Sequence, residues 1–434
     1  MNLTIHRGTQ EIGGSCVELW TENTRILIDF GMPLVEKTGE EFDFNKYKGL
    51  TREQLVEKGV LPNIKGLYKY EKPQVDGIII SHAHQDHYGL SSFINPEINF
   101  YLGEATHKII ELTNLFTPQN TVFANPIFFK KENTFQIGDF KITPYWNDHS
   151  AFDAYSFLVE ANGKRIFYSG DFRSHGRKWR AYKWFLHNAP REVDYLLLEG
   201  SNVGQADKSS LSEERIEDKL VEQFNQDNNI NLIYTSGQNI DRLISIYKAC
   251  LRANKTLVVD VYIAKVLKEL SRFAKLPYPS ADYKNLRVIF PYYTSKRLTN
   301  EGNKHILFQF KDYKITKAQV AQYPEDIVMI VRPSMQKDLD HIKGIDGGTL
   351  IYSMWTGYLE KSNTKKFIDY LEKRNFSVKY LHTSGHADTE ALKEMVKAIN
   401  PDYIIPIHTF GGRDYKKIFS KPVVELKDGE IRRI

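Results

Sequence analysis

The sequence is poor in cysteine and has no long apolar run. Only Cys16 and Cys250 are present among 434 residues, too few for a disulfide framework and in keeping with a reducing compartment. No stretch approaches the roughly 18 to 20 apolar residues that span a bilayer. The opening segment MNLTIHRGTQ lacks the apolar core of a secretion signal. These absences predict a cytoplasmic protein with no membrane segment.

The composition also lacks a strong charge bias and low-complexity tracts. Hydrophobic residues make up 41%, charged residues 26% and aromatic residues 13%, as in ordinary globular proteins. A net charge of +5 permits a polyanionic partner without requiring one. The length is large for one compact core, so the sequence predicts two domains or one domain with a large insertion.

The pattern of strands and helices changes near residue 210. Before it, short strands alternate with tight turns, including a predicted hairpin over residues 17–28 and a helix that starts at a Thr51–Gln54 capping box. After it, helical stretches at 209–226 and 239–254 alternate with strands at 230–236 and 256–261. This alternation predicts parallel βαβ units in a separate α/β domain. The chain beyond residue 376 reads as strand, helix and strand.

The segment SHAHQDHYGL, residues 81–90, gathers four residues that can bind metal. His82 and His84 are two apart, so in an extended chain both side chains point the same way. If a helix starts next, Asp86 and His87 can turn toward the same point from another direction. Imidazole suits zinc, and a carboxylate also tolerates manganese. Since the chain has only 13 histidines, a polar turn with three by chance is the weaker interpretation.

The motif His82-Ala83-His84-Gln85-Asp86-His87 resembles the HxHxDH motif of the metallo-β-lactamase fold hydrolases. The family's later motifs follow in order as NDHS with His149, YSGDFR with Asp171, and PIHTF with His408. The resemblance implies an α/β fold, a four-layer αβ/βα sandwich, with two divalent metal ions at one edge. It assigns His82, His84 and His149 to one ion, and Asp86, His87 and His408 to the other. Asp171 would bridge the two ions.

Two further residues are candidates for supporting the ligands from behind. Asp29 in LIDFG matches the family's early strand-end motif, where the carboxylate steadies a ligand histidine. An Asp that merely caps a turn is the alternative. His175 follows Asp171 closely and is either a supporting contact or a surface histidine.

The α/β segment interrupts the fold between Asp171 and His408, where the β-CASP nucleases carry an inserted α/β domain. We therefore expect residues 1–204 and 376–434 to form the metallo-β-lactamase domain and residues 205–375 the β-CASP domain. LLLEGSN resembles the acidic motif of that family, with Glu199, and TSGHAD resembles its histidine motif, with His386. The third motif, here His408, is histidine in family members that process RNA and valine in those that process DNA.

This resemblance implies a two-metal ribonuclease that hydrolyses single-stranded RNA as a 5′ exonuclease, an endonuclease or both. Two metals activate the attacking hydroxide and stabilise the developing charge. His386 would assist the leaving group, and Glu199 would orient its imidazole and keep it protonated. The catalytic residues are thus expected to be Asp86, His386 and Glu199, with zinc as the first choice of metal and manganese as the second.

Phosphate contacts are expected where strands give way to helices. Ser236, Gly237 and Gln238 lie at one such junction, and Ser384 and Gly385 lie at another, where free N–H groups favour anions. Both junctions are also ordinary places for Ser and Gly. Arg332 either reaches the RNA backbone or pairs with an acid.

Residues 281–320 combine eight Lys/Arg and three Asp/Glu with seven aromatic residues. Single-strand binding uses this mixture, although a solvated basic face explains it equally well.

Two alternatives remain beside the ribonuclease. A DNA nuclease or DNA-end-processing enzyme shares the chemistry, but His408 argues against it. A non-catalytic RNA-binding scaffold would lack ligands, and here all seven are present. The expected partner is single-stranded RNA, with DNA second. A homodimer and protein partners are left open.

Overall fold

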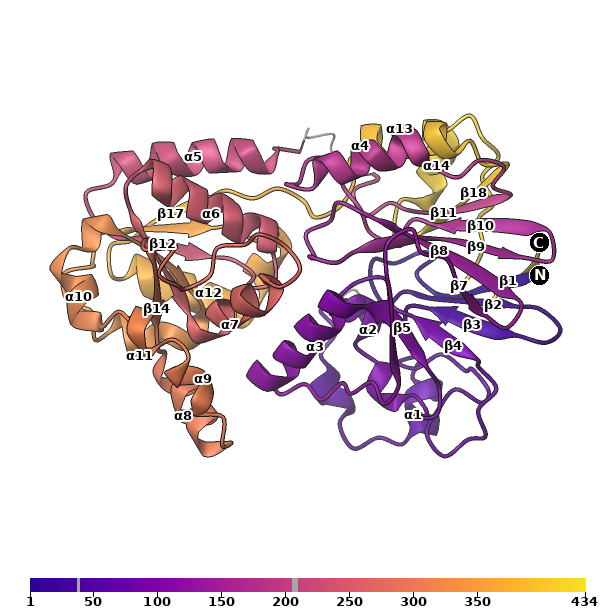
Figure 1. Cartoon of the computed structure of the whole chain (residues 1–434), viewed down its shortest axis with the longest axis horizontal. Coiled ribbons are helices and arrows are strands. Elements are labelled where there is room, and N and C mark those ends of the chain that lie inside the picture. Colours follow the sequence, from indigo (N-terminus) through magenta and orange to yellow (C-terminus); the bar gives the residue numbers. More distant parts are fainter. Residues whose placement is uncertain (37–39, 205–209) are drawn as a thin grey trace. The chain divides into compact units, whose positions relative to one another are not determined.

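The computed structural model describes residues 1–36, 40–204 and 210–434, which form two compact units (Figure 1). The first unit combines Met1–Ser209 with Gly385–Ile434, and the second spans Ser210–Ser384. The domain boundaries read from the sequence, after residues 204 and 375, stay predictions. The second boundary falls before strand β17 (Ser377–Tyr380), which pairs with the sheet of the second unit.

The first unit contains two sheets. The seven-stranded sheet has the order β19-β1-β2-β3-β4-β5-β6, and the six-stranded sheet has the order β18-β11-β10-β9-β8-β7. The strands of the first sheet are β1 Asn2–Arg7, β2 Cys16–Trp20, β3 Arg25–Ile28, β4 Gly77–Ile79, β5 Phe100–Gly103, β6 Pro126–Phe129 and β19 Ile431–Arg433. Those of the second are β7 Phe135–Ile137, β8 Phe140–Trp146, β9 Tyr155–Ala161, β10 Lys164–Tyr168, β11 Tyr195–Glu199 and β18 Tyr403–Ile407.

Helices cover the outer faces of both sheets within this unit (Figure 1). Helices α1 Arg52–Glu57, α2 Gln85–Tyr88 and α3 Glu104–Phe116 lie on one side, and α4 Trp179–Asn188, α13 Thr389–Ile399 and α14 Tyr415–Ile418 on the other. Between the sheets lies an apolar core to which Leu19, Ile79, Phe157 and Ile405 contribute. The four-layer αβ/βα sandwich expected from the resemblance is therefore confirmed.

Local sequence explains several of these elements. The polar stretch between residues 20 and 25 turns β2 back onto β3, with Val17 opposite Ile28. The Thr51 hydroxyl accepts from the Gln54 N–H while the Gln54 side chain accepts from the Thr51 N–H, so the predicted capping box is present.

The second unit is a parallel sheet with helices. Its strand order is β14-β13-β15-β12-β16-β17, and every pairing is parallel, which confirms the predicted βαβ units. The remaining strands are β12 Asn231–Tyr234, β13 Thr256–Asp260, β14 Leu286–Ile289, β15 Ile327–Val331 and β16 Thr349–Tyr352. The helices are α5 Glu213–Gln226, α6 Ile240–Arg252, α7 Val261–Leu270, α8 Tyr292–Asn300, α9 His305–Phe308, α10 Lys317–Gln322, α11 Gln336–Leu339 and α12 Ser362–Glu372. Across the described ranges, no helix has both the length and the apolarity that crossing a bilayer requires.

Candidate metal centre

The candidate ligands follow the ends of strands at one edge of the first unit. His82 comes shortly after β4, His149 after β8, Asp171 after β10 and His408 directly after β18. Strands β10, β11 and β18 are parallel neighbours, so their carboxyl ends meet at the same edge. This topology brings together residues that are far apart in the sequence.

The first group of donors consists of three imidazoles. The Nδ1 atom of His84 lies 3.1 Å from Nε2 of His82 and 3.1 Å from Nε2 of His149. His82 and His149 are fully buried, and all three donor atoms lie within 4.8 Å of one another. Three nitrogens that converge in this way are the ligand set of a zinc-type site.

The second group combines two carboxylates and two imidazoles. Asp86, His87, Asp171 and His408 bring their donor atoms within 4.8 Å of one another. Oδ2 of Asp171 lies 3.1 Å from Nε2 of His87, and Oδ2 of Asp86 lies 3.2 Å from Nε2 of His408. The same Asp171 oxygen is 3.8 Å from Nε2 of His82, so this carboxylate faces both groups.

The short helix α2 depends on a glycine that packs against it. The N–H of Ser15 donates to the Asp86 carbonyl, and the N–H of Phe30 donates to the His87 carbonyl. A Cβ on Gly31 would lie 1.6 Å from the Asp86 carbonyl oxygen. Only glycine therefore fits at this position, and its close approach fixes the turn that carries Asp86 and His87.

Two residues of the site have left-handed backbone conformations that are unusual outside glycine. Asp29 has φ of 61° and His408 has φ of 55°. The N–H of His408 donates to the Gly8 carbonyl at 2.6 Å, which helps to hold this conformation. Such strain concentrates at functional sites, because the surrounding structure must stabilise it.

Asp29 lies behind the ligands and accepts four hydrogen bonds. Its carboxylate receives the N–H and the hydroxyl of Ser81 at 2.7 and 2.8 Å, and the Tyr168 hydroxyl at 2.7 Å. The fourth partner is Nδ1 of His87 at 2.8 Å, whose Nε2 faces Asp171. The carboxylate thus orients the His87 ring. The sequence analysis did not identify Tyr168 and Ser81 as partners of this carboxylate.

The charges in the cluster match its use as a cation site. Burial lowers the pKa of His84 to about 4 and holds the pKa values of His82 and His149 well below the usual range, so these rings are neutral donors. Burial alone would raise the pKa of Asp86, but His87 and His408 lower it to about 2. Asp171 likewise keeps a pKa well below normal because of His408 and His87, despite its burial. Ionised carboxylates buried this deeply need cations beside them.

His386 lies next to the second donor group with Glu199 and Ser201. Nδ1 of His386 is 3.4 Å from Oε1 of Glu199 and 3.1 Å from the Ser201 hydroxyl. Burial alone would lower the pKa of His386, but the charges of Glu199 and Asp171 raise it to about 9. Glu199 is itself fixed, because its Oε2 accepts the N–H and the hydroxyl of Ser201, each at 3.0 Å.

Ser201 links the histidine motif to the last ligand. Its hydroxyl lies 2.9 Å from Nδ1 of His408 and 3.1 Å from Nδ1 of His386. In the LLLEGSN motif, the sequence predicts a role for Glu199 but not for Ser201. A serine in a strand-end turn carries no signal of its own, because such turns use serine for backbone reasons.

His149 is held from three directions. The Gly385 carbonyl accepts from its Nδ1 at 2.6 Å, and the Lys178 ammonium donates to its carbonyl at 2.8 Å. The preceding Asp148 is fully buried and pairs with the equally buried Arg173 at 3.3 Å. Lys178 and the Arg173–Asp148 pair were not identified in the sequence.

The other expected phosphate contacts lie in the second unit. Ser236, Gly237 and Gln238 connect β12 to α6, and Gln238 Nε2 donates to the Tyr262 hydroxyl at 2.9 Å. Arg332 lies over the same Tyr262 ring at 5.4 Å and forms an ion pair with Asp260 at 2.8 Å. The structure therefore brings Gln238 and Arg332 to one tyrosine, and Arg332 does pair with an acid. Ser384 is the last residue of this unit.

In the first unit, His175 is buried, with 9% of its surface exposed.

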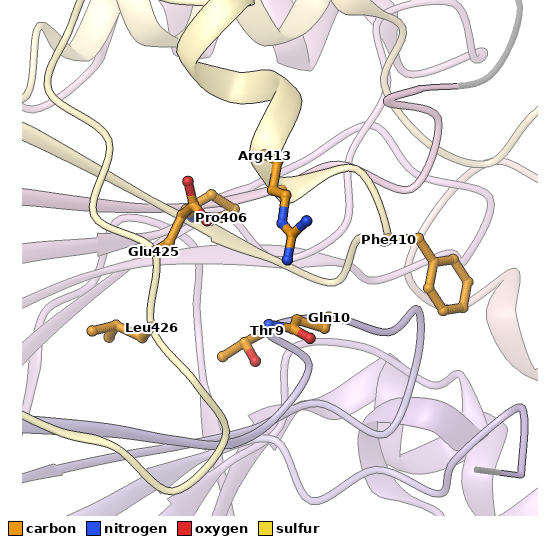
Figure 2. Close-up of a pocket in the computed structure, with 8 residues that line it drawn as sticks. Thr9, Gln10, Pro406, Phe410, Arg413, Glu425 and Leu426 are labelled. Atoms are coloured by element: carbon orange, nitrogen blue, oxygen red, sulfur yellow. The ribbon is translucent and has the colours of Figure 1, made fainter.

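A cavity of about 250 Å³ opens beside the loop that follows His408 (Figure 2). It is lined by Thr9, Gln10, Pro406, Phe410 and Arg413 among others, and Figure 2 shows the Arg413 side chain extending toward Gln10. None of the ligand residues lines it. The converging donors, rather than this cavity, mark the site of the chemistry.

The donor set fits a divalent metal centre. Nitrogen and carboxylate donors converge in two groups, their rings are oriented by Asp29 and by the Gly385 carbonyl, and the buried carboxylates supply the negative charge. This geometry and the donor chemistry support divalent metal binding by the chain.

Comparisons with known proteins agree with this geometry. A profile described as "Beta-lactamase superfamily domain" matches residues 50–208, and one described as "Zn-dependent metallo-hydrolase RNA specificity domain" matches residues 372–410. Ribonuclease J of Helicobacter pylori is 23% identical over 94% of this chain, and the endoribonuclease ysh1 of Schizosaccharomyces pombe is 23% identical over 84% of it. The chain is therefore similar to the ribonuclease J-like β-CASP proteins with a metallo-β-lactamase fold.

The chain spans only part of these relatives, 56% of the Helicobacter pylori protein and 51% of the Schizosaccharomyces pombe protein. A crystal structure of a protein of unknown function from Enterococcus faecalis matches with a TM-score of 0.79 at 21% identity, over 99% of both chains. At that identity, the likeness concerns the fold alone.

Proposed function

We propose that this protein is a metal-dependent ribonuclease that hydrolyses phosphodiester bonds of single-stranded RNA, as a 5′ exonuclease, an endonuclease or both. The observation that carries the proposal is the placement of His386, with its raised pKa, beside two complete groups of metal donors. An RNA substrate is favoured over DNA by His408 in the third motif and by the RNA specificity profile over residues 372–410.

In this proposal, the ligand residues hold two divalent ions. When bound, the ions supply Lewis-acid activation of the attacking water and neutralise charge on the phosphate. Zinc suits the three imidazoles, and manganese suits the set with two carboxylates. Asp171 faces both groups, so it would fix one ion relative to the other.

His386 would supply the proton that the leaving oxygen needs. In the metal-free protein, the charges of Glu199 and Asp171 raise the pKa of His386 and favour the charged imidazolium, and Glu199 is the partner that is not itself a candidate ligand. Nδ1 of His386 faces Glu199 and Ser201, and Nε2 of the same ring would donate to the leaving oxygen. Glu199 keeps the ring oriented during this transfer, and Ser201 ties its position to that of His408.

The test is a cleavage assay on matched single-stranded RNA and DNA, each labelled at either end and carrying a 5′-monophosphate or 5′-hydroxyl. Asp86→Ala and His386→Ala are compared with His187→Ala, which removes an exposed histidine on α4. RNA cleavage that is lost in the first two variants and kept in the third supports the proposal, and the product ladder separates exonuclease from endonuclease. Cleavage of DNA alone would replace RNA by DNA as the substrate. Absence of cleavage in the metal-loaded protein, with RNA still bound, would indicate a non-catalytic scaffold.

A further inference from the structure

A groove in the second unit runs along helix α8. It has a volume of about 420 Å³, within the range of ligand sites, and we call it the α8 groove. Its lining residues include Phe290, Tyr292, Lys296, Lys314, Lys317 and Asp338. The helix follows the edge strand β14 and projects with α9 from this unit (Figure 1).

The α8 groove carries an excess of positive charge. Asp338 is buried and already satisfied, because its carboxylate accepts the Tyr292 N–H at 3.1 Å and pairs with Lys317 at 2.8 Å. Lys296 and Lys314 are exposed, and neither forms an ion pair with any residue that the structure describes. The groove therefore presents two uncompensated ammonium groups to solvent.

Aromatic rings lie close to lysine ammonium groups on this surface. Tyr292 is 42% exposed, and its neighbour Tyr293 is 55% exposed. The Lys314 ammonium lies 5.1 Å from the centre of the Phe290 ring, and the Lys337 ammonium lies 3.8 Å from that of Tyr292. Exposed rings flanked by cations suit stacked bases and the phosphates between them.

A serine adds an uncommitted hydrogen-bonding group. The Ser295 hydroxyl oxygen is buried, lines the groove and has no hydrogen-bond partner among residues 1–36, 40–204 and 210–434. A buried polar atom without a partner is unfavourable, so a ligand that supplies one gains affinity there. A phosphate oxygen or a ribose hydroxyl is suited to this contact.

We propose that the α8 groove is a binding site for single-stranded RNA, separate from the metal centre. Lys296 and Lys314 contact consecutive phosphates, Phe290 and Tyr292 support a base, and Ser295 bonds the backbone. The identity of the RNA as the ligand rests on the proposed ribonuclease function. An acidic polypeptide would match the lysines but would leave the exposed rings without a stacking partner.

The experiment measures the affinity of the full chain for a 5′-fluorescein-labelled single-stranded RNA, by anisotropy at several salt concentrations. Asp86→Ala serves as the background so that the probe stays intact, with His386→Ala in its place if the first does not fold. The groove variants are Lys296→Gln/Lys314→Gln and Tyr292→Ala, with Tyr292→Phe to keep the ring. The matched control is Lys219→Gln/Lys248→Gln, which removes the same charge from exposed positions on α5 and α6.

Loss of two phosphate contacts should reduce the slope of log affinity against log salt by about 1.4 for a single strand. Tyr292→Ala should weaken binding roughly 5- to 150-fold, the range for one stacked base, while Tyr292→Phe and the control pair bind as the background does. Groove variants that bind RNA as tightly as the control pair overturn the proposal, whether or not the wild-type protein cleaves RNA. Binding that depends on the groove in a protein that cleaves nothing supports the α8 groove and refutes the ribonuclease. Poly-glutamate that binds as tightly, with the same sensitivity to Tyr292→Ala, assigns the groove to an acidic protein instead.

Discussion

Asp29→Asn tests how the metal centre is held, because it changes one charge while keeping the shape of the side chain. Asparagine also tolerates the left-handed backbone at this position, where φ is 61°, so the substitution adds little backbone strain. Four groups donate to the carboxylate, two from Ser81 and one each from Tyr168 and His87. The single amide oxygen of asparagine cannot accept from all four. The His87 ring thereby loses the anionic partner that fixes its Nε2 toward Asp171.

Partners of this kind affect metal affinity about 10- to 100-fold, so we expect Asp29→Asn to weaken metal binding by that factor. Buried donors left without an acceptor should also lower the free energy of unfolding of the metal-free protein by about 1–3 kcal/mol. Competition with a fluorescent zinc chelator measures the first effect, and denaturant unfolding measures the second. Tyr168→Phe removes one of the same hydrogen bonds but leaves His87 and the charge alone, so it should lower stability more than affinity. Unchanged metal affinity in Asp29→Asn, together with reduced stability, would refute the orienting role.

Three further predictions concern Gly31, His386 and the two cysteines. Gly31→Ala places a Cβ against the Asp86 carbonyl, so it should lower the free energy of unfolding by about 3 kcal/mol or more and reduce the amount of bound metal. In the control Gly412→Ala, the nearest contact of the new Cβ would be Pro406 Cβ at 3.3 Å, so the loss of stability should be small. Equal losses of stability in denaturant unfolding would contradict the packing argument. His386→Ala should lower kcat about 10²- to 10⁴-fold without changing the metal content, and Glu199→Gln should lower kcat by a smaller factor. Single-turnover kinetics and metal analysis of each variant check this. A loss of metal in His386→Ala would show that His386 is a ligand. Burial raises the pKa of the Cys16 and Cys250 thiols, so neither should react with a thiol reagent in the native protein, while both should react after unfolding; rapid labelling at neutral pH would show that one is accessible.

The sequence predicts most accurately those structural features that are determined by residues close together in the chain. The spacing of His82, His84, Asp86 and His87 is a local property, and the structure turns this segment from β4 through His84 into α2 as the spacing implied. The alternation of strands and helices after residue 210 likewise predicted parallel βαβ units, because each unit is encoded within a few dozen residues.

Contacts between distant segments could not be read in this way. His149, Asp171 and His408 were assigned through a family resemblance, since no local pattern indicates that the ends of β8, β10 and β18 meet. Ser201 was missed because its hydroxyl meets rings from positions 386 and 408, which only the folded chain brings close. The Arg173–Asp148 pair was missed for the same reason, and ordinary surface pairs of Arg and Asp look identical in a sequence.

The position of His408 gives the metal centre a second physical role. The other candidate ligands precede the whole second unit, whereas His408 follows it, directly after strand β18, which lies next to β11 at the edge of the six-stranded sheet. Ions shared by these ligands would join segments that lie on either side of the insertion, as a covalent cross-link does. Because these segments meet only in the folded chain, the free energy of metal binding adds to the free energy of unfolding. Removal of the metal by a chelator should therefore lower the local stability of strand β18 and helix α13. The metal supply would then control the stability of the segment that follows the second unit in the chain.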